Sequence, residues 1–429
     1  MSEPRNETGQ LLIPDPSASI PTVTLRSHVR QPNIFRKRVL RADPNAGPGD
    51  WVAVYVDSEE ANEQAEQQLL GYGIYNPRSE IAVRMLRFDS RLPDEPFWNA
   101  LFEKAISLRR DFLQLDQSTN AYRVFHAEAD GLPGLVIDRY DDVLSLEAYS
   151  LGMYNRAAAI AEKLGGMLGT KHWYVRTSPQ ILAQEGYDRS PLNSPEAPAR
   201  LTINEFGTRF RIRMDEPTHK TGFFCDQRDN RRMLANYSNG KSVLDLCCYN
   251  GGFAIQAKRL GQAAEVTGVD LDEHPLKAAR DNANLNQVRV KFVQADVFPY
   301  MRDMIRGGQQ FDVVVLDPPK LIRSRSEIEE GTQKHFDLNR LAIQLVRPGG
   351  LLLTCTCAGL LPAFEFTQLV TNAARYAAQN SEEPTTGSLR GRELRIIAKT
   401  GAAPDHPVGG NCLETEYLTA IWARVDDFS

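Results

Sequence analysis

Residues 242–270, SVLDLCCYNGGFAIQAKRLGQAAEVTGVD, decide the fold. An apolar strand pattern is followed by two glycines, an amphipathic helix pattern, and a second apolar strand that ends in Asp270, which is the order of a βαβ unit. The same alternation runs on to the end of the chain, with strands expected at 290–296, 311–317, 351–357, 393–399 and 416–425 and helices at 275–285, 300–307, 336–346 and 363–378. Such repeats predict an α/β fold with a parallel sheet covered by helices on both faces, and the last two strands predict a hairpin at its edge.

Before this region the sequence pattern predicts a tail and two further domains. Residues 1–20 have no periodicity and are predicted to be a flexible tail. Residues 21–96 contain short β-type runs separated by turn clusters and predict a small β-rich domain. Residues 97–216 predict a small α+β domain with helices near 97–113 and 153–168 and a hairpin at 201–214, so that residues 217–429 form the α/β domain.

Composition narrows the class of protein. The chain has 429 residues, of which 50 are Lys or Arg and 55 are Asp or Glu, so a uniformly basic nucleic-acid-binding surface is excluded. Residues 26–41 nevertheless hold six basic residues and no acidic one, which suits either a phosphate backbone or a solvated loop. No apolar run reaches the length of about 18 residues that spans a bilayer, and the first residues are polar, so we expect a cytoplasmic protein without membrane contact.

The cysteines do not indicate a metal site. Their spacings include no Cys-x-x-Cys pair, and the sequence predicts reduced thiols and no bound metal.

Acidic residues follow three of the predicted parallel strands, at Asp245, Asp270 and Asp296. Ligands of open parallel sheets bind beyond the carboxyl ends of the strands, where a carboxylate can accept hydrogen bonds from a ribose. The loop after Asp245 lacks the G-x-G-x-x-G spacing of dinucleotide sites. The pattern therefore favours a nucleoside without a pyrophosphate, and the alternative is that each acid only caps the following helix.

A fourth strand ends in Asp317-Pro-Pro-Lys320. The prolines stiffen this turn, which suits holding Asp317 against a planar base. A rigid loop that merely closes the strand is the alternative.

Together, several motifs make the sequence similar to the S-adenosylmethionine-dependent 23S ribosomal RNA cytosine-5 methyltransferase family. They are Thr221–Arg228 (TGFFCDQR), Asp245–Phe253, Gly268–Asp270, Asp317–Lys320, Thr354–Gly359 (TCTCAG) and Asp405–Val408 (DHPV). The resemblance implies a Rossmann-like class I methyltransferase domain preceded by a PUA-like RNA-binding domain and a small α+β domain. It also implies large-subunit ribosomal RNA as partner and, by analogy, a homodimer.

The resemblance further implies roles for individual residues. Asn250 and Gly251 would line the methionine part of S-adenosylmethionine, Asp270 its ribose and Asp296 its adenine. Gln227 and Arg228 would lie at the entrance, where Arg228 either pairs with the cofactor carboxylate or forms an ion pair on a helix surface. The remaining implied cofactor contacts are Asp245, Tyr249, Leu271, Val297 and Asp317.

For catalysis the resemblance implies a cysteine that adds to carbon 6 of cytosine and so activates carbon 5. Cys357 matches the family's catalytic cysteine, while Asp317 and Lys320 would contact the base. Spacing alone does not separate Cys357 from Cys355, because residues two apart share one face of a strand. Cys247 and Cys248 are expected to be packing residues.

The sequence departs from the family pattern at two places. His28–Asn33 stands where the family commonly has a G-H-P-W-like start to its RNA-binding domain, and Ala358 stands where Ser commonly follows the cysteine. Two other functions remain open: methylation of a guanine ring nitrogen, which needs no cysteine, and RNA binding without catalysis.

Overall fold

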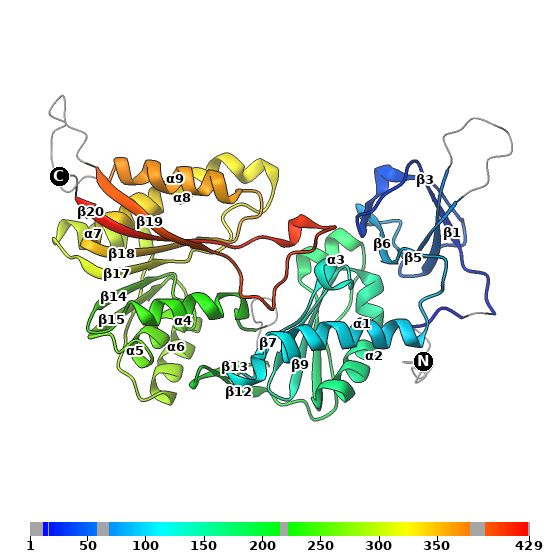
Figure 1. The fold of residues 1–429 in the computed structure, drawn as a ribbon, viewed down its shortest axis with the longest axis horizontal. Coiled ribbons are helices and arrows are strands. Elements are labelled where there is room, and N and C mark those ends of the chain that lie inside the picture. The colour runs from blue at the N-terminus through cyan, green and yellow to red at the C-terminus, as the bar shows by residue number, and fades with distance from the viewer. Residues whose placement is uncertain (1–11, 16, 58–67, 215–221, 378–390, 428–429) are drawn as a thin grey trace. The chain divides into compact units, whose positions relative to one another are not determined.

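The computed structural model describes residues 12–15, 17–57, 68–214, 222–377 and 391–427, and the chain forms two compact units (Figure 1). The first unit comprises Met1–Ile203, Ile212–Cys225 and Pro404–Thr415. The second comprises Asn204–Arg211, Asp226–Ala403 and Glu416–Ser429. No described helix is long and apolar enough to cross a membrane.

The first unit begins with the predicted β-rich domain. Six strands form one sheet in the order β2-β6-β5-β4-β1-β3. They are β1 (Thr22–Leu25), β2 (Asn33–Phe35), β3 (Val39–Ala42), β4 (Trp51–Val56), β5 (Gln68–Tyr75) and β6 (Ile81–Arg87). Alternating apolar residues of these strands, including Val23, Val54 and Val83, are completely buried and form its core.

The central α+β part of the first unit is a five-stranded sheet in the order β11-β10-β9-β8-β7. Its elements are α1 (Glu95–Ser107), β7 (Ala121–His126), β8 (Leu135–Tyr140), β9 (Val143–Ala148), α2 (Leu151–Leu168), β10 (His172–Arg176), α3 (Pro179–Glu185) and β11 (Leu192–Asn193). Helices α1 and α2 bury Trp98, Phe102 and Ile160 against the sheet, so both predicted helices are present. Ser150 caps α2 by accepting a hydrogen bond from the backbone N–H of Met153.

Part of the predicted flexible tail is packed. Residues 1–11 and 16 lie outside the described residues, but Leu12 is 6% exposed and belongs to the core of the central part. The indole Nε1 of buried Trp98 donates to the carbonyl oxygen of Leu12 at 2.9 Å. The prediction is therefore wrong for Leu12, because an apolar residue and a needed acceptor hold it in place.

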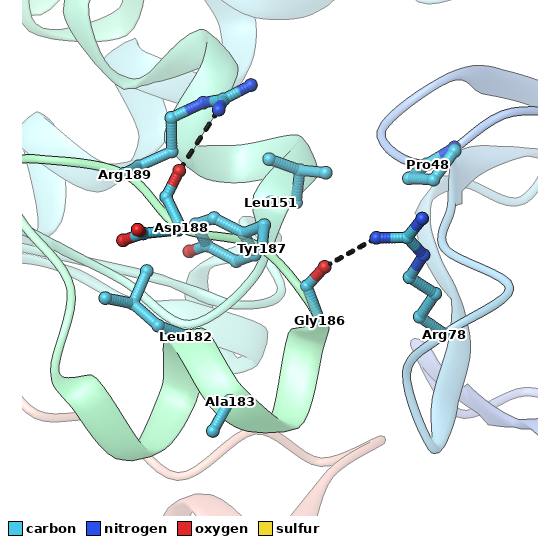
Figure 2. Close-up of a pocket in the computed structure, with 9 residues that line it drawn as sticks. All are labelled: Pro48, Arg78, Leu151, Leu182, Ala183, Gly186, Tyr187, Asp188 and Arg189. Atoms are coloured by element: carbon cyan, nitrogen blue, oxygen red, sulfur yellow. Dashed lines mark hydrogen bonds between the residues drawn. The ribbon is translucent and has the colours of Figure 1, made fainter.

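A buried carboxylate at the end of α3 links the central part of the first unit to its β-rich part. Glu185 accepts hydrogen bonds from Asn76 and Ser79 and forms an ion pair with Arg84. Beside it, Arg78 Nη1 donates to the carbonyl oxygen of Gly186 at 2.8 Å, at the edge of a pocket of 590 Å³ that Figure 2 shows. The β-rich and central parts therefore form one unit.

The hairpin β12 (Arg200–Glu205) and β13 (Thr208–Arg213) follows, as predicted. Its tip, Asn204–Arg211, belongs to the second unit.

The second unit has a seven-stranded sheet in the order β16-β15-β14-β17-β18-β20-β19. Its strands are β14 (Ser242–Leu246), β15 (Glu265–Asp270), β16 (Lys291–Gln294), β17 (Phe311–Leu316), β18 (Val346–Thr356), β19 (Arg392–Thr400) and β20 (Thr419–Asp427). The first five in sequence pair in parallel, and β20 pairs antiparallel with β18 and β19. The predicted fold class and edge hairpin are confirmed.

Helices cover both faces of this sheet (Figure 1). They are α4 (Arg228–Asn236), α5 (Gly252–Arg259), α6 (Glu273–Leu285), α7 (Val297–Arg306), α8 (Ile328–Gln344) and α9 (Ala363–Arg375). Residues of α4 and α5 pack on one face, and residues of α7, α8 and α9 on the other. The strand order reverses at β14 and β17, which is where open parallel sheets bind ligands.

Candidate active site

The loop after β14 has an unusual backbone. Cys247 and Tyr249 have φ angles of 62° and 49°, and Gly251 has a φ of 80°. Left-handed conformations are unfavourable for residues with a Cβ, so such a loop persists only where its surroundings hold it. At Gly251 a Cβ would also lie 3.1 Å from the side chains of Ala279 and Phe292. This position therefore requires glycine.

Asp245 lies at the base of this loop and is 1% exposed. Its Oδ2 accepts from the backbone N–H of Ala254 at 3.0 Å, whereas its Oδ1 is buried without a hydrogen-bond partner among the described residues. Burial raises the pKa of Asp245 well above its usual range, and the negative charges of Asp317 and Asp270 raise it further. The site thus contains an acceptor that a ligand donor would satisfy.

The acids that end β15 and β16 both bind backbone. Asp270 accepts from the N–H of Tyr249 at 2.8 Å and from that of Asp272 at 3.1 Å, so it fixes the loop after β14. Asp296 is exposed and caps α7 by accepting from the N–H of Phe298. The capping alternative is thus realised at Asp296, although each carboxylate oxygen retains lone pairs for further hydrogen bonds.

The neighbours of these acids differ in exposure. Leu271 is 67% exposed, and Tyr249, Asn250 and Val297 are partly buried. An exposed leucine directly after Asp270 offers an apolar surface beside the carboxylate.

Asp317 is held by a chain of hydrogen bonds. Gln227 Nε2 donates to Asp317 Oδ2 at 3.1 Å, and Asn230 Nδ2 donates to Gln227 Oε1 at 2.6 Å. Thr400 Oγ1 donates to Asn230 Oδ1, and Trp422 Nε1 donates to Thr400 Oγ1. Residues far apart in the sequence thereby orient one carboxylate at the end of β17. Sequence reasoning missed Asn230, whose only signal was its position one helical turn after Gln227.

The two candidate cysteines differ in access. Cys355 is completely buried within β18, and burial raises the pKa of its thiol well above the usual range, with the charge of Asp317 adding to the shift. Cys357 lies just beyond the end of β18 and is partly exposed. Desolvation, together with the negative charge of Asp270, also raises the thiol pKa of buried Cys248 and of partly exposed Cys247. Among these four, Cys357 and Cys247 are partly exposed, and of the two candidate nucleophiles only Cys357 is accessible to a substrate.

The two cationic side chains of the site, Lys320 and Arg228, differ in their exposure to solvent. Lys320 is exposed on the loop after β17. Arg228 is 1% exposed, and its Nε lies 3.5 Å from Asp229 Oδ1, so the predicted alternative of an ion pair on its own helix is present. The Thr221 position of the first motif lies outside the described residues.

Two regions of the chain match models of known protein families. The model of an S-adenosylmethionine-dependent methyltransferase family matches residues 141–381, and that of a PUA-like domain matches residues 26–88.

Similar proteins match nearly the whole chain. "Ribosomal RNA large subunit methyltransferase I" of Aeromonas hydrophila is 35% identical over 400 residues, covering 92% of this chain and 95% of the relative. The protein of the same name from Escherichia coli strain SMS-3-5 is 33% identical, covering 92% of this chain and 96% of the relative.

Solved structures share the fold. One protein described as a methyltransferase, solved in complex with SAH, has a TM-score of 0.75 at 19% identity, covering 95% of this chain and 100% of its own. Another, described as an S-adenosylmethionine-dependent methyltransferase from Streptococcus mutans, has a TM-score of 0.73 at 18% identity with the same coverage.

Proposed function

The chain belongs to the S-adenosylmethionine-dependent methyltransferase family, and from this premise we propose that it methylates carbon 5 of a cytosine in large-subunit ribosomal RNA. The observation that carries the carbon-5 chemistry is Cys357, a partly exposed cysteine beyond the end of β18. This strand lies next to β17, which Asp317 directly follows. The names of the relatives support ribosomal RNA as the substrate. Such a substrate would place the activity in the cytoplasm.

The residues after β14 fit the cofactor. The buried, unpartnered Oδ1 of Asp245 and the tight turn at Gly251 suit a polar ligand with donor groups. We propose that Asn250 and Gly251 hold the methionine part, Asp270 the ribose, and Asp296 with Leu271 and Val297 the adenine. Gln227, Arg228 and Tyr249 would complete the pocket. When bound, S-adenosylmethionine supplies a methyl group, carried on a positively charged sulfur, to carbon 5.

The chemistry requires activation of the base, because carbon 5 of cytosine is a poor nucleophile. The Cys357 thiolate adds to carbon 6, a sulfur–carbon bond forms, and the electron pair of the 5,6 double bond moves to carbon 5. After carbon 5 has been methylated, a base removes its proton, the double bond forms again, and Cys357 leaves as thiolate. The burial of Cys355 argues against its taking this role.

The loop Asp317–Lys320 would recognise the cytosine. The Asp317 carboxylate, oriented by Gln227, accepts a hydrogen bond from the Watson–Crick edge or stabilises the protonated ring. Lys320 offsets negative charge on the ring carbonyl. The target base must lie in single-stranded RNA or leave its stack to reach Cys357.

The PUA-like domain would bind RNA through its basic stretch. Within Arg26–Arg41, all six Lys and Arg residues are exposed. Phe35 and Leu40 are 45% and 40% exposed among them. Cations that neutralise phosphates, together with exposed apolar side chains on which bases pack, are typical of surfaces that bind single-stranded nucleic acid.

Nucleoside analysis tests the proposal directly. Purified protein is incubated with unmodified ribosomal RNA and labelled S-adenosylmethionine, and the digested RNA is analysed by mass spectrometry. We expect 5-methylcytidine from the unaltered chain and none from Cys357→Ala, whereas the control Cys355→Ala retains activity. RNA containing 5-fluorocytidine should form a covalent conjugate that Cys357→Ala abolishes, because fluorine cannot be removed as the carbon-5 proton is.

Three outcomes contradict the proposal. Methylguanosine as product, or nearly full activity of Cys357→Ala, would support methylation of a guanine ring nitrogen instead. Calorimetry without any S-adenosylmethionine binding would point to a noncatalytic RNA-binding protein.

A further inference from the structure

The tip of the hairpin β12–β13 packs against α4 and α5 of the second unit through buried polar contacts. Glu205 is completely buried and accepts two hydrogen bonds from the guanidinium of Arg231, at 2.8 and 2.6 Å. Gln256 Nε2 donates to Glu205 Oε1 at 3.1 Å, and Thr208 Oγ1 donates to Gln256 Oε1 at 2.7 Å. Paired buried charges of this kind fix geometry strongly, because separating them leaves an unpaired charge away from water.

The same hairpin tip is bound by Asn282 of α6 and by Asn286, the C-cap residue of that helix. Asn286 Oδ1 accepts from the backbone N–H of Arg209 at 2.9 Å, and Asn286 Nδ2 donates to the Arg209 carbonyl oxygen at 2.6 Å. One turn earlier, Asn282 Oδ1 accepts from the backbone N–H of Arg211 at 2.8 Å. The main chain of β13 is therefore hydrogen-bonded to asparagine side chains in α6 and at its C-cap.

Asn282 also reaches the loop after β14. It is completely buried, and its Nδ2 donates to the carbonyl oxygen of Asn250 at 3.4 Å. One amide thus binds the hairpin with its oxygen and the loop with its nitrogen. Asn286 has no such second contact with the loop among the described residues.

A second contact supports the loop at its other end. A Cβ on Gly252, the first residue of α5, would lie 3.1 Å from Arg231 Cδ, so the arginine held by Glu205 packs directly on the start of the helix. The loop 247–251 carries two non-glycine residues with left-handed backbones, and such a loop needs support from its surroundings.

We propose that the hairpin tip braces the cofactor-binding loop and that Asn282 is the positioning residue that transmits this support to Asn250 and Gly251. This inference rests on the proposed role of these two residues in holding S-adenosylmethionine. Support before binding lowers the ordering cost of binding, so its loss weakens affinity for the cofactor more than it slows methyl transfer at saturation.

Two matched substitutions, one in α6 and one at its C-cap, test whether Asn282 supports the loop. Asn282→Asp keeps the acceptor for Arg211 but loses the donor to Asn250. Asn286→Asp keeps the acceptor for the Arg209 N–H and loses the donors to the Arg209 and Asn282 carbonyl oxygens, neither of which belongs to the loop. We expect Asn282→Asp to raise the Kd of S-adenosylmethionine, measured by calorimetry, about tenfold and to leave kcat at saturating cofactor within about twofold. Asn286→Asp should change the Kd less than about twofold.

Hydrogen exchange in the protein without cofactor gives a readout independent of activity. The amides of Tyr249–Gly252 should exchange faster in Asn282→Asp than in Asn286→Asp. If the buried carboxylate prevents folding, Asn282→Ala removes both contacts without adding charge and should show the same faster exchange.

Equal Kd values and equal hydrogen exchange of the loop for the two aspartate variants would contradict the proposal that Asn282 positions the loop. Gly251→Ala separates this failure from that of the proposed site. If Gly251→Ala binds S-adenosylmethionine as the unaltered chain does, the role of the loop is wrong. If only Gly251→Ala weakens binding, the loop holds the cofactor but Asn282 does not position it.

Discussion

At the scale of single residues, the structure separates side chains that the sequence presents as equivalent. Thr354, Cys355 and Thr356 alternate along β18, and Cys357 lies just beyond its end. The threonines differ in their contacts. Thr356 Oγ1 lies 3.2 Å from His335 Nε2 and accepts from the backbone N–H of Ala358 at 3.3 Å. Thr354 Oγ1 is buried without a hydrogen-bond partner among the described residues.

Thr356→Val should therefore impair the enzyme, whereas Thr354→Val should not. The first change breaks both contacts that fix the turn carrying Cys357, and we expect a loss of about 1 to 3 kcal/mol in unfolding free energy. Displacement of Cys357, the proposed nucleophile, should lower kcat roughly ten- to hundredfold. Urea unfolding and methyl-transfer kinetics measure both effects.

Thr354→Val is the matched control, since it removes a buried hydroxyl that has no hydrogen bond to lose. Its stability should stay within about 0.5 kcal/mol of the unaltered chain or rise. Equal effects of the two substitutions would show that the Thr356 hydroxyl does not position Cys357.

At the scale of elements, the loop that carries Asp317 and Lys320 is set by a close approach to a helix. A Cβ on Gly331, in the first turn of α8, would lie 2.4 Å from Ile322 Cγ1 and 2.6 Å from the carbonyl oxygen of Leu321. Only glycine allows this contact. Helix propensity alone favours alanine at such a position, so packing overrides propensity here.

Gly331→Ala should accordingly destabilise the protein by about 1 to 3 kcal/mol and displace the Asp317–Lys320 loop. We expect a lower kcat, measured in the methyl-transfer assay, because both proposed base contacts move. Gly166 in α2 is the control, since it is exposed and an added Cβ there meets nothing within 4 Å. Gly166→Ala should stabilise by about 0.5 to 1 kcal/mol. If Gly331→Ala also stabilised, the close approach would be excluded.

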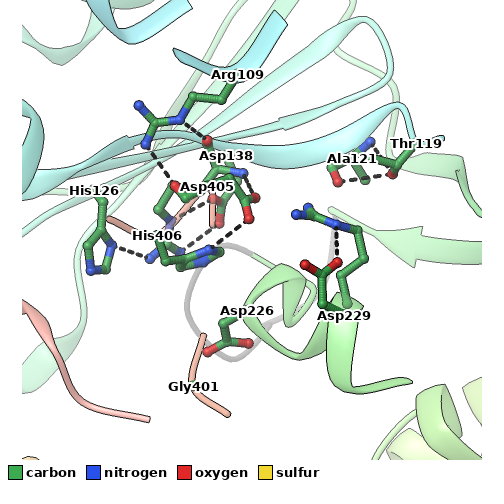
Figure 3. A network of polar contacts seen from close by, with 12 residues as sticks. Arg109, Thr119, Ala121, His126, Asp138, Asp226, Asp229, Gly401, Asp405 and His406 are labelled. Atoms are coloured by element: carbon green, nitrogen blue, oxygen red, sulfur yellow. Dashed lines mark hydrogen bonds and ion pairs between the residues drawn. The ribbon is translucent and has the colours of Figure 1, made fainter. Parts of the chain in front are cut away.

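At the scale of the whole molecule, neither compact unit is one continuous segment of the chain. Pro404–Thr415 lies between β19 and β20 of the second unit but belongs to the first. Asp405 anchors it, because its Oδ2 accepts from the backbone N–H of Arg123 at 2.8 Å and its carbonyl oxygen accepts from Arg109 at 2.7 Å (Figure 3). The expected assignment of all residues after 216 to one domain therefore does not hold for this segment.

The same network contains a histidine that stays neutral. Arg123 Nη1 donates to His126 Nδ1 at 3.0 Å, and His126 Nε2 lies 3.2 Å from the carbonyl oxygen of Thr415. An arginine can only donate, so the Nε2–H tautomer satisfies both contacts. Burial, with the positive charge of Arg123 beside it, lowers the pKa of His126 to about 3.

Stability of the first unit should therefore fall on mild acidification. In the unfolded chain, His126 takes up a proton near its ordinary pKa of about 6.5, whereas in the folded protein it does so only near pH 3. Its contribution to the free energy of unfolding is therefore complete above pH 6.5 and is lost as the pH falls towards 3. Between pH 7 and 5 the loss amounts to about 2 kcal/mol. Hydrogen exchange of the slowest β7–β9 amides measures it.

His126→Gln provides the comparison, because glutamine does not titrate in this range. Its stability is lower at pH 7 but should fall less between pH 7 and 5 than that of the unaltered chain. Parallel pH profiles for the two proteins would contradict a neutral His126.

The sequence by itself determined the α/β order of the second unit, the β-rich domain before it and the acids at the strand ends. Each depends on residues close in the chain, since apolar periodicity and turn residues set elements locally. Only the tertiary structure decided that Gln227 and Asn230 hold Asp317, that Cys355 is buried while Cys357 is not, and that Pro404–Thr415 joins the first unit. These contacts join residues distant in the chain, and they form because packing satisfies buried polar groups that no local pattern specifies.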